Sequence, residues 1–156
     1  MKKIMDKILE SVAVLLITIM ICVSSWQVLS RYVLKSPSAF TEEFLRFSLI
    51  WLSMLGIAYM FGKKQHISID FLKKKFMEKD QVLLEMIIVG IFTLFSIVVM
   101  IIGGGNAVMM SLKQISPSLG LPMAYVYLSL PVSGFFIVAY SALIIGDLKK
   151  KYNNIR

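Results

Sequence analysis

The sequence predicts an all-α integral membrane protein, with four transmembrane helices and a short interfacial amphipathic helix between the second and the third. Hydrophobic residues make up 58% of the 156 residues and charged residues only 17%, which is too apolar for a water-soluble domain of this size. Four segments supply the ~20 apolar residues that a helix needs to cross a hydrocarbon core of ~30 Å. Lysine and arginine mostly flank these segments, as is typical of membrane proteins.

The four predicted spans are residues 12–30, 44–61, 86–110 and 121–146 of a single membrane domain, 1–156. Each should be helical, because backbone polar groups cannot stay unpaired in lipid. The first span follows the basic start MKKIMDKILE, which superficially resembles a secretory signal. Its apolar run is longer than that of a typical signal peptide, and no A-x-A-like cleavage site follows, so we expect the span to remain uncleaved.

The basic residues predict how the chain is oriented. With the amino terminus inside the cell, 13 of the 17 Lys and Arg residues lie in cytoplasmic segments. Those on the opposite side are Arg31, Lys35, Arg46 and Lys113. Cytoplasmic loops carry an excess of Lys and Arg, so both termini should be cytoplasmic. The net charge of +8 does not indicate nucleic-acid binding, because the lysines flank apolar runs instead of sharing a face with aromatic residues.

The connection between the first two spans is predicted to break one helix and start the next. Residues 36–38 read Ser-Pro-Ser, and either Ser38 or Thr41 can cap the following helix. Glu42 and Glu43 fall in its first turns, where a carboxylate interacts favourably with the positive end of the helix dipole.

A group of charged residues lies at this outer end of the first two spans. Glu42 and Arg46 form an i, i+4 pair, and Arg31 at the end of the first span is placed to meet Glu42 or Glu43. We expect the four to form an ion-pair clasp that holds the two spans together or docks a partner. A role in a transport path is the alternative, because ionisable groups at membrane depth are often functional.

The second span has two different faces. Ser53 and Gly56 continue the face that begins with Glu42 and Arg46. Small residues let helix backbones approach closely, so this face is predicted to pack against another helix. The opposite face carries bulky and apolar residues: Phe44, Phe47, Trp51, Leu55 and Ala58.

An interfacial helix is predicted at about residues 67–80. Apolar residues recur there at helical spacing among lysines, which is typical of a helix that lies along an anionic membrane surface. The residues expected to contact the membrane are Ile69, Leu72, Lys73, Lys74, Lys75 and Phe76. The alternative is an ordinary solvated loop.

The third and fourth spans contain possible helix breaks. The helical pattern of the third runs from Val82 to about Leu112, or ~45 Å at ~1.5 Å per residue, so the helix must tilt, extend beyond the bilayer or bend at residues 103–105, a run of glycines. The glycines favour close helix contact, with unwound backbone for an ion as the alternative. In the fourth span Pro122 should occupy the first helical position, and Pro131 should cause a kink.

Few residues could support chemistry or hold a cofactor. Cys22 and His66 are each the only residue of their type, so we expect no intramolecular disulfide, no bis-histidine haem and no multi-histidine metal site. A single histidine can act as a proton switch, but a hydrogen-bonded histidine at the interface is the favoured interpretation. The carboxylates lack a paired nucleophile and base, so we predict neither enzymatic activity nor a cofactor.

Five motifs in order resemble a known family. They are R-Y-x-x-x-x-P, T-E-E-x-x-R-x-x-x-x-W, G-x-A-Y, H-I-x-x-D and P-S-L-G-L-P-M-A-Y-x-Y-L-x-L-P. Their positions are Arg31, Tyr32 and Pro37; Thr41, Glu42, Glu43, Arg46 and Trp51; Gly56, Ala58 and Tyr59; His66, Ile67 and Asp70; and residues 117–131. The chain is similar to the small, Q-type (DctQ-like) membrane subunit of tripartite ATP-independent periplasmic (TRAP) transporters, although Phe40 stands where the family often has tryptophan.

The resemblance implies a scaffold without chemistry of its own in the bacterial inner membrane. In that family a larger, M-type membrane subunit carries the solute and sodium sites, and a periplasmic binding protein delivers the solute, usually an organic acid. The partners implied are therefore the large subunit, the binding protein and membrane lipids.

Two other classes of function are compatible with four spans. A self-contained small exporter of the four-helix multidrug type would need an ionisable residue in the middle of its first span, and residues 12–30 have none. A membrane anchor for a redox or signalling enzyme would, in its cofactor-bearing form, need haem ligands that this sequence lacks.

Overall fold

The structure, a computed structural model, describes residues 2–36, 38–63 and 78–154. Among these the secondary structure is helical, with one isolated antiparallel bridge between Ile115 and Pro122. The elements are α1 (Lys2–Tyr32), α2 (Ala39–Gly62), α4 (Glu78–Phe95), η1 (Ser96–Gly103), α5 (Gly104–Ser111), α6 (Ala124–Tyr127) and α7 (Ser129–Asn154). In the described part of the chain four helices are long and apolar enough to cross a membrane, which confirms the predicted all-α membrane fold.

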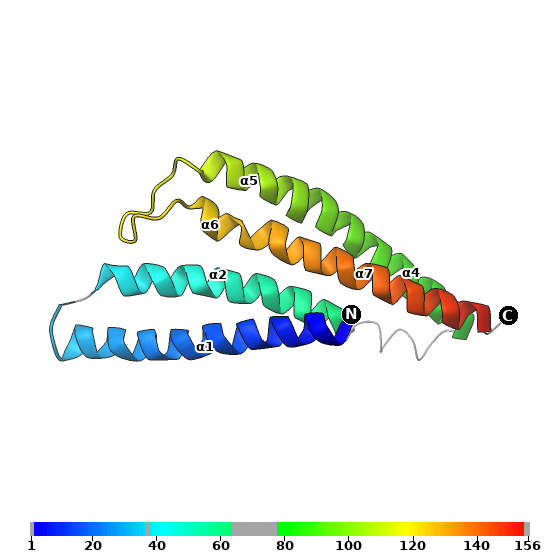
Figure 1. The fold of residues 1–156 in the computed structure, drawn as a ribbon, viewed down its shortest axis with the longest axis horizontal. Coiled ribbons are helices and arrows are strands. Elements are labelled where there is room, and N and C mark those ends of the chain that lie inside the picture. Colours follow the sequence, from blue (N-terminus) through cyan, green and yellow to red (C-terminus); the bar gives the residue numbers. More distant parts are fainter. Residues whose placement is uncertain (1, 37, 64–77, 155–156) are drawn as a thin grey trace.

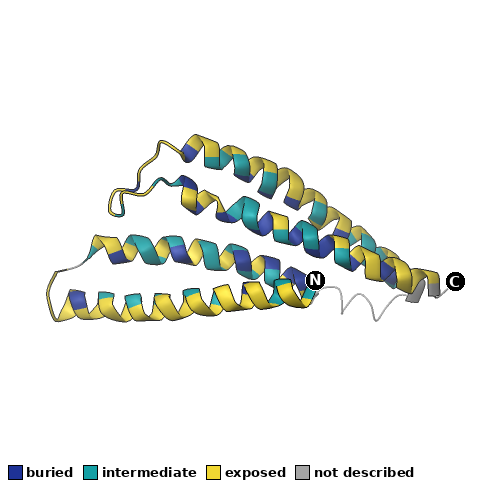
Figure 2. Cartoon of the chain, viewed as in Figure 1, coloured by how far each residue is buried: buried dark blue, intermediate teal, exposed yellow. Residues whose placement is uncertain are grey.

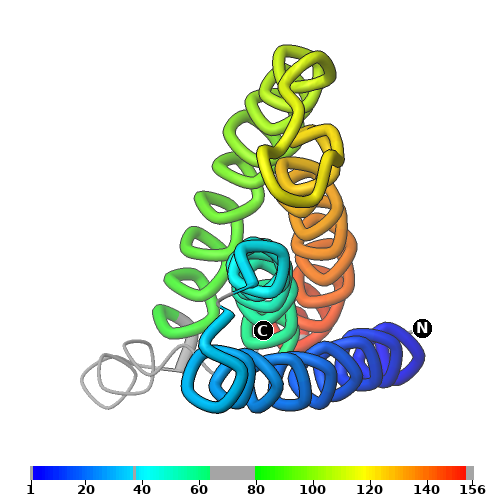
Figure 3. The backbone as a smooth tube through the Cα atoms, turned by 90° about the vertical axis from the view of Figure 1, so that its left-hand side faces the viewer, coloured from blue at the N-terminus to red at the C-terminus, as the bar shows by residue number. Residues whose placement is uncertain are grey.

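The helices form an elongated bundle with two distinct ends (Figure 1). We call the end with the α1–α2 connection (33–38) and the α5–α6 connection (112–123) the loop end. We call the end with both chain termini the terminal end. Helix α1 packs on α2, α2 packs on α7, and α7 packs on α4 and η1. Seen along the bundle, α2 therefore lies between α1 and the second pair of helices (Figure 3).

The four helices contribute very unequally to the buried core. Only 6% of the most apolar stretch of α1 is buried, against 39% for the helix that runs through α6 and α7. Figure 2 shows the same contrast, with most of α1 exposed. The core joins α2 to α7 through Leu55, Ala58, Phe61, Ile137, Tyr140 and Ile144. Most of the surface of α1 is thus left for lipid or for another protein.

Glycine allows close contact at the places where helices cross. A Cβ atom on Gly134 of α7 would lie 2.9 Å from the Cβ of Met100 in η1, and one on Gly104 would lie 2.9 Å from the Cβ of Leu130. In lipid there is little hydrophobic force between helices, so close packing of this kind supplies much of their association. Gly104 therefore acts in helix contact, as expected for the glycine run.

The third predicted span is one helix from Asp80 to Ser111, and it contains an unusual segment. Its central eight residues, η1, are π-helical, and this segment packs on α7. Ser96 at its start donates a hydrogen bond of 2.9 Å to the carbonyl oxygen of Gly134. Gly103 and Gly104 keep helical backbone angles. The alternative prediction, unwound backbone at these glycines, is therefore wrong.

The start of the fourth span differs from the prediction. The helix begins at Ala124, and Pro122 forms the bridge with Ile115 instead of occupying the first helical position. The bridge is extended by Met123, whose amide donates to the carbonyl oxygen of Gln114 at 2.8 Å. The loop before the helix is thus held by pairing across itself, which keeps residues 121–123 out of the helix.

The other predicted spans lie inside longer helices. Residues 12–30 fall within α1 and residues 44–61 within α2. The predicted interfacial helix at 67–80 lies outside the described residues, except that 78–80 belong to α4. His66 and all six residues expected to contact the membrane surface are also outside the described part.

The close contact at Gly134 can be tested by adding one methyl group. Gly134→Ala should lower the thermal midpoint of the purified chain in detergent, because forcing an atom into a packed contact typically costs about 1–3 kcal/mol. Gly90→Ala is the matched control, since a Cβ there would meet nothing within 4 Å. Equal midpoints for the two variants would contradict the proposed role of Gly134.

Candidate functional site

Glu43 holds the α5–α6 connection against α2 at the loop end. One oxygen of its carboxylate, Oε2, accepts hydrogen bonds of 2.9 Å from the backbone amides of Ser118 and Leu119. The same loop is closed by a hydrogen bond of 3.1 Å that the backbone amide of Gly120 donates to the carbonyl oxygen of Ser116. Gly120 has a φ of +66°, which favours glycine. Two charge-assisted hydrogen bonds to one carboxylate oxygen fix the loop in position, so Glu43 links this loop to α2.

Trp51 makes a second link between the same two parts of the chain. Its indole Nε1 donates to the carbonyl oxygen of Tyr125 at 3.1 Å. Tyr125 lies in α6, just before the interruption at Leu128 that separates α6 from α7. The motif from Thr41 to Trp51 and the motif at 117–131, which are far apart in the sequence, therefore meet in space.

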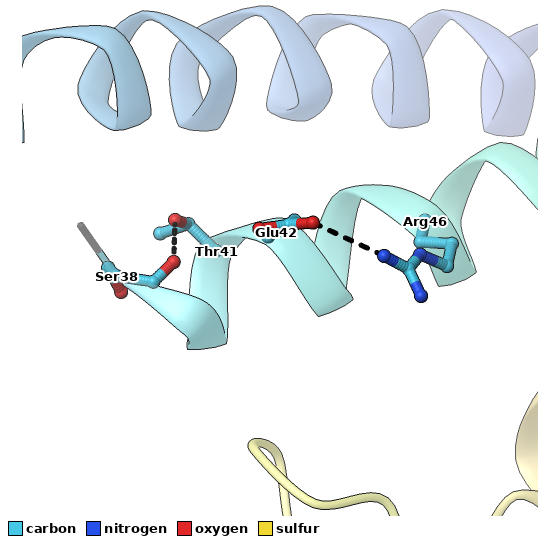
Figure 4. Close-up of polar contacts among 4 residues, drawn as sticks. All are labelled: Ser38, Thr41, Glu42 and Arg46. Atoms are coloured by element: carbon cyan, nitrogen blue, oxygen red, sulfur yellow. Dashed lines mark hydrogen bonds and ion pairs between the residues drawn. The ribbon is translucent and has the colours of Figure 1, made fainter. Parts of the chain in front are cut away.

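The neighbouring carboxylate, Glu42, has a different partner. Its Oε1 lies 3.2 Å from Nη2 of Arg46, and the side chains of Arg46 and Glu42 are 68% and 56% exposed. Figure 4 shows this ion pair beside Thr41, whose hydroxyl donates to the carbonyl oxygen of Ser38 at 2.8 Å. An exposed i, i+4 pair contributes only about 0.3–0.5 kcal/mol. It is therefore largely available to other molecules.

Arg31 does not complete the expected clasp. Within the described residues no ion pair joins Arg31 to Glu42 or Glu43, because Glu42 pairs with Arg46 and Glu43 is occupied by the loop. The turn after α1 is held instead by Ser30, whose hydroxyl donates to the carbonyl oxygen of Ser36 at 2.6 Å. The link between the first two spans that was expected from Arg31 is thus absent, and its docking role stays a prediction.

The small residues of α2 do not pack within this chain. Ser53 is exposed, and its hydroxyl donates back to the carbonyl oxygen of Leu49 at 2.8 Å. A Cβ on Gly56 would meet nothing within 4 Å. The core uses the opposite face, with Leu55 and Ala58 buried. Ser53 and Gly56 thus make no close helix contact among the described residues, and the packing predicted for them would need a partner molecule.

A polar cluster at the terminal end was missed in the sequence. The hydroxyl of Tyr140 donates to Oδ1 of Asp6 at 2.6 Å, and Nζ of Lys63 lies 3.9 Å from Oδ2 of the same carboxylate. The ring of Tyr140 lies against Gly62, where a Cβ would come within 2.6 Å of it. The cluster joins α7 to both α1 and the end of α2. The available signal was Asp6, an acidic residue within the basic start of the chain.

The electrostatics of this cluster favour a charged lysine. The side chain of Tyr59, and to a smaller extent Asp6, raise the pKa of Lys63 above its usual value. Nζ of Lys63 lies 5.2 Å from the centre of the Tyr59 ring, within reach of a cation–π interaction. Lys63 therefore stays protonated at neutral pH and partners Asp6.

The described residues offer no evident place for a metal ion. Within them, no three His, Cys, Asp or Glu side chains come together. What the polar groups do is structural: they join helix to loop at one end and helix to helix at the other. The fold and these contacts define a multi-pass membrane protein whose polar side chains organise the bundle.

The chain belongs to the DctQ component family of tripartite ATP-independent periplasmic transporters, whose family model matches residues 20–149. This confirms the family indicated by the five motifs. The protein is therefore a membrane-spanning component of a TRAP transporter.

Individual relatives agree with this assignment. The chain is 29% identical over 138 residues to the sialic acid TRAP transporter small permease protein SiaQ of Vibrio cholerae, covering 88% of this chain and 79% of that protein. It is 27% identical over 144 residues, 90% of this chain and 87% of the relative, to a provisionally named TRAP transporter small permease protein of Haemophilus influenzae. A stretch of 53 residues, 34% of this chain, is 40% identical to 9% of the sialic acid TRAP transporter permease protein SiaT of H. influenzae.

The two carboxylates of the second span can be distinguished by hydrogen exchange. Glu43→Ala should increase amide exchange across residues 116–120, because the amides of Ser118 and Leu119 lose their shared carboxylate acceptor. Glu42→Ala removes only the exposed ion pair and should leave the loop unchanged. Similar protection of the loop in both variants would contradict the assigned role of Glu43.

The terminal-end cluster can be tested with the hydroxyl of Tyr140. Tyr140→Phe keeps the ring against Gly62 but leaves Asp6 without its closest donor, which should destabilise the bundle by about 1–3 kcal/mol. Thermal unfolding in detergent measures the loss. Tyr125→Phe is the control, because Tyr125 is 62% exposed and its hydroxyl should contribute little. An unchanged midpoint for Tyr140→Phe would refute the structural role of this bond.

Proposed function

We propose that this protein is the noncatalytic scaffold subunit of a TRAP-type secondary transporter that imports organic acids. The large, M-type permease subunit carries the solute and couples transport to sodium, and a periplasmic solute-binding protein delivers it. The single observation that carries this proposal is the match to the DctQ component family over residues 20–149. The contacts of the polar residues agree with a structural role, because Glu43, Asp6 and Tyr140 form hydrogen bonds with groups of the same chain.

Association with a large permease is supported by the relative SiaT of H. influenzae. That protein is named as a permease, and 53 residues of this chain match a stretch that is only 9% of its length. A segment similar to the small subunit thus occurs in a much longer permease. The largely exposed α1 and the Ser53–Gly56 face of α2 provide surface for such an association.

The solute class is proposed from the relatives' names. The V. cholerae relative is named for sialic acid, which is an organic acid. Solute recognition would then reside in the large subunit and the binding protein, and the small subunit would hold the large one at a fixed height in the bilayer.

The proposed location is the bacterial inner membrane with both termini in the cytoplasm. Both termini lie at the same end of the bundle (Figure 1), and 13 of 17 basic residues fall in segments that this orientation makes cytoplasmic. The loop end then faces the periplasm. The lysines at 73–75, with Ile69, Leu72 and Phe76, are proposed to hold the cytoplasmic side at anionic lipid.

The predicted clasp is now divided among several roles. Arg31 remains a proposed docking contact for the large subunit, since it is exposed at the loop end. Glu43 orders the α5–α6 connection, so the effect of Glu43 on docking would be indirect. Glu42 and Arg46 border a groove between α1 and α2.

Reconstitution tests the proposal. The chain should co-purify in mild detergent with a large membrane protein encoded beside it, and liposomes that contain both should take up an organic acid only with a sodium gradient and the binding protein. Liposomes with this chain alone should show no uptake. Transport by the chain alone would instead support the self-contained exporter, and purification without any large partner would count against a TRAP scaffold.

A further inference from the structure

A groove runs along the surface between α1 and α2, with a volume of about 670 Å³. This is within the range of about 300–1,000 Å³ typical of small-molecule sites. The side chains along most of its length are apolar: Ile17, Met20, Ile21, Leu45, Leu49 and Leu52. Polar side chains gather toward the loop end: Ser24, Ser25, Glu42 and Arg46. The groove is therefore amphipathic along the bundle, with its polar part at one membrane surface.

The length of the groove matches one leaflet of the bilayer. Its residues in α1 extend from Ile17 to Ser25 and those in α2 from Glu42 to Leu52. At ~1.5 Å per residue these stretches are ~12 and ~15 Å long, about half of the ~30 Å hydrocarbon core. On α2 the groove runs from the outer end of the span 44–61 to its middle, and on α1 it crosses the middle of the span 12–30. A ligand with its polar group beside Glu42 would therefore have an apolar part that reaches the middle of the membrane.

The charges at the polar end select the kind of headgroup. Arg46 uses Nη2 to reach Oε1 of Glu42, which leaves most of the five guanidinium donors free, and the guanidinium is well suited to phosphate. Glu42 offers its second carboxylate oxygen as an acceptor. Both side chains are more than half exposed. The pair thus presents one donor site for an anion and one acceptor site for a cationic N–H group, a few ångströms apart.

We propose that this groove binds one phospholipid with a phosphoethanolamine headgroup, taken from the leaflet at the loop end. The phosphate binds Arg46, the primary ammonium binds Glu42, and an acyl chain lies along the apolar part between α1 and α2. A choline headgroup cannot donate a hydrogen bond to Glu42, and a phosphoglycerol headgroup has no cation for it. The proposal does not depend on which solute is transported or on the large subunit.

Native mass spectrometry of the purified full chain tests the headgroup preference. The chain is mixed in detergent with phosphatidylethanolamine, phosphatidylcholine or phosphatidylglycerol that carry identical acyl chains. One phosphatidylethanolamine should stay bound, about tenfold more tightly than either alternative, since a charge-assisted hydrogen bond is worth about that factor. Equal retention of the three lipids would mean bulk solvation by lipid and would overturn the proposal.

Variants test the two charged residues separately. Arg46→Gln and Glu42→Gln should each lower phosphatidylethanolamine retention about tenfold. Lys113→Gln is the matched control, because it also removes an exposed charge near the loop end but does not line the groove. Thermal midpoints of all variants check that the bundle is intact. Leu49→Trp, which fills the groove without changing charge, should also displace the lipid.

The complex of this chain with the large membrane protein shows whether the groove holds lipid or is covered by protein. The same lipid should remain when the chain is isolated together with the large membrane protein, and its loss should follow Arg46→Gln there too. If the wild-type complex instead excludes the lipid while the free chain binds it, the groove is a protein interface and the proposal is wrong. The free chain can show no lipid selectivity while the complex still transports solute. The result for the lipid site is therefore distinguishable from the result for the proposed function.

Discussion

The packing of the Tyr140 ring on the backbone of Gly62, with its hydroxyl bonded to Asp6, is the contact on which the rest of the bundle depends. Helix α1 has little other contact with α7 and rests mainly on α2. Lipid tails are as apolar as leucine, so exclusion of water does not hold these helices together. Close approach at a glycine and a hydrogen-bonded polar cluster do so instead, and both occur here at the terminal end, where three helices converge.

The loop end is organised by a different device. Glu43 and Trp51, both on α2, bind backbone groups of the α5–α6 loop and of α6. The two halves of the bundle are thus connected at both ends, by side chains that reach the other half's backbone at one end and by the Asp6 cluster at the other. These links connect the two halves of the bundle although few apolar residues are buried.

The outer face of the first two helices remains open in this arrangement. Charged residues that a sequence reading would group together have separated into an internal role for Glu43 and an external one for Glu42 and Arg46. The groove beside that pair combines apolar side chains with one positive and one negative side chain, which are complementary to a zwitterionic headgroup. This combination is what the proposed phospholipid site rests on.

The sequence alone determined the four long apolar helices, the family and the i, i+4 pair of Glu42 and Arg46, because each depends on residues near one another in the chain or on motif order. Only the tertiary structure decided the partners of Glu43 and Asp6, which lie 75 and 134 residues away at Ser118 and Tyr140. It also decided that Arg31 stands apart, that Pro122 pairs across its loop and that the third span is π-helical where it meets Gly134. The bilayer constrains each span separately, whereas contacts between spans depend on where the whole bundle brings distant residues together.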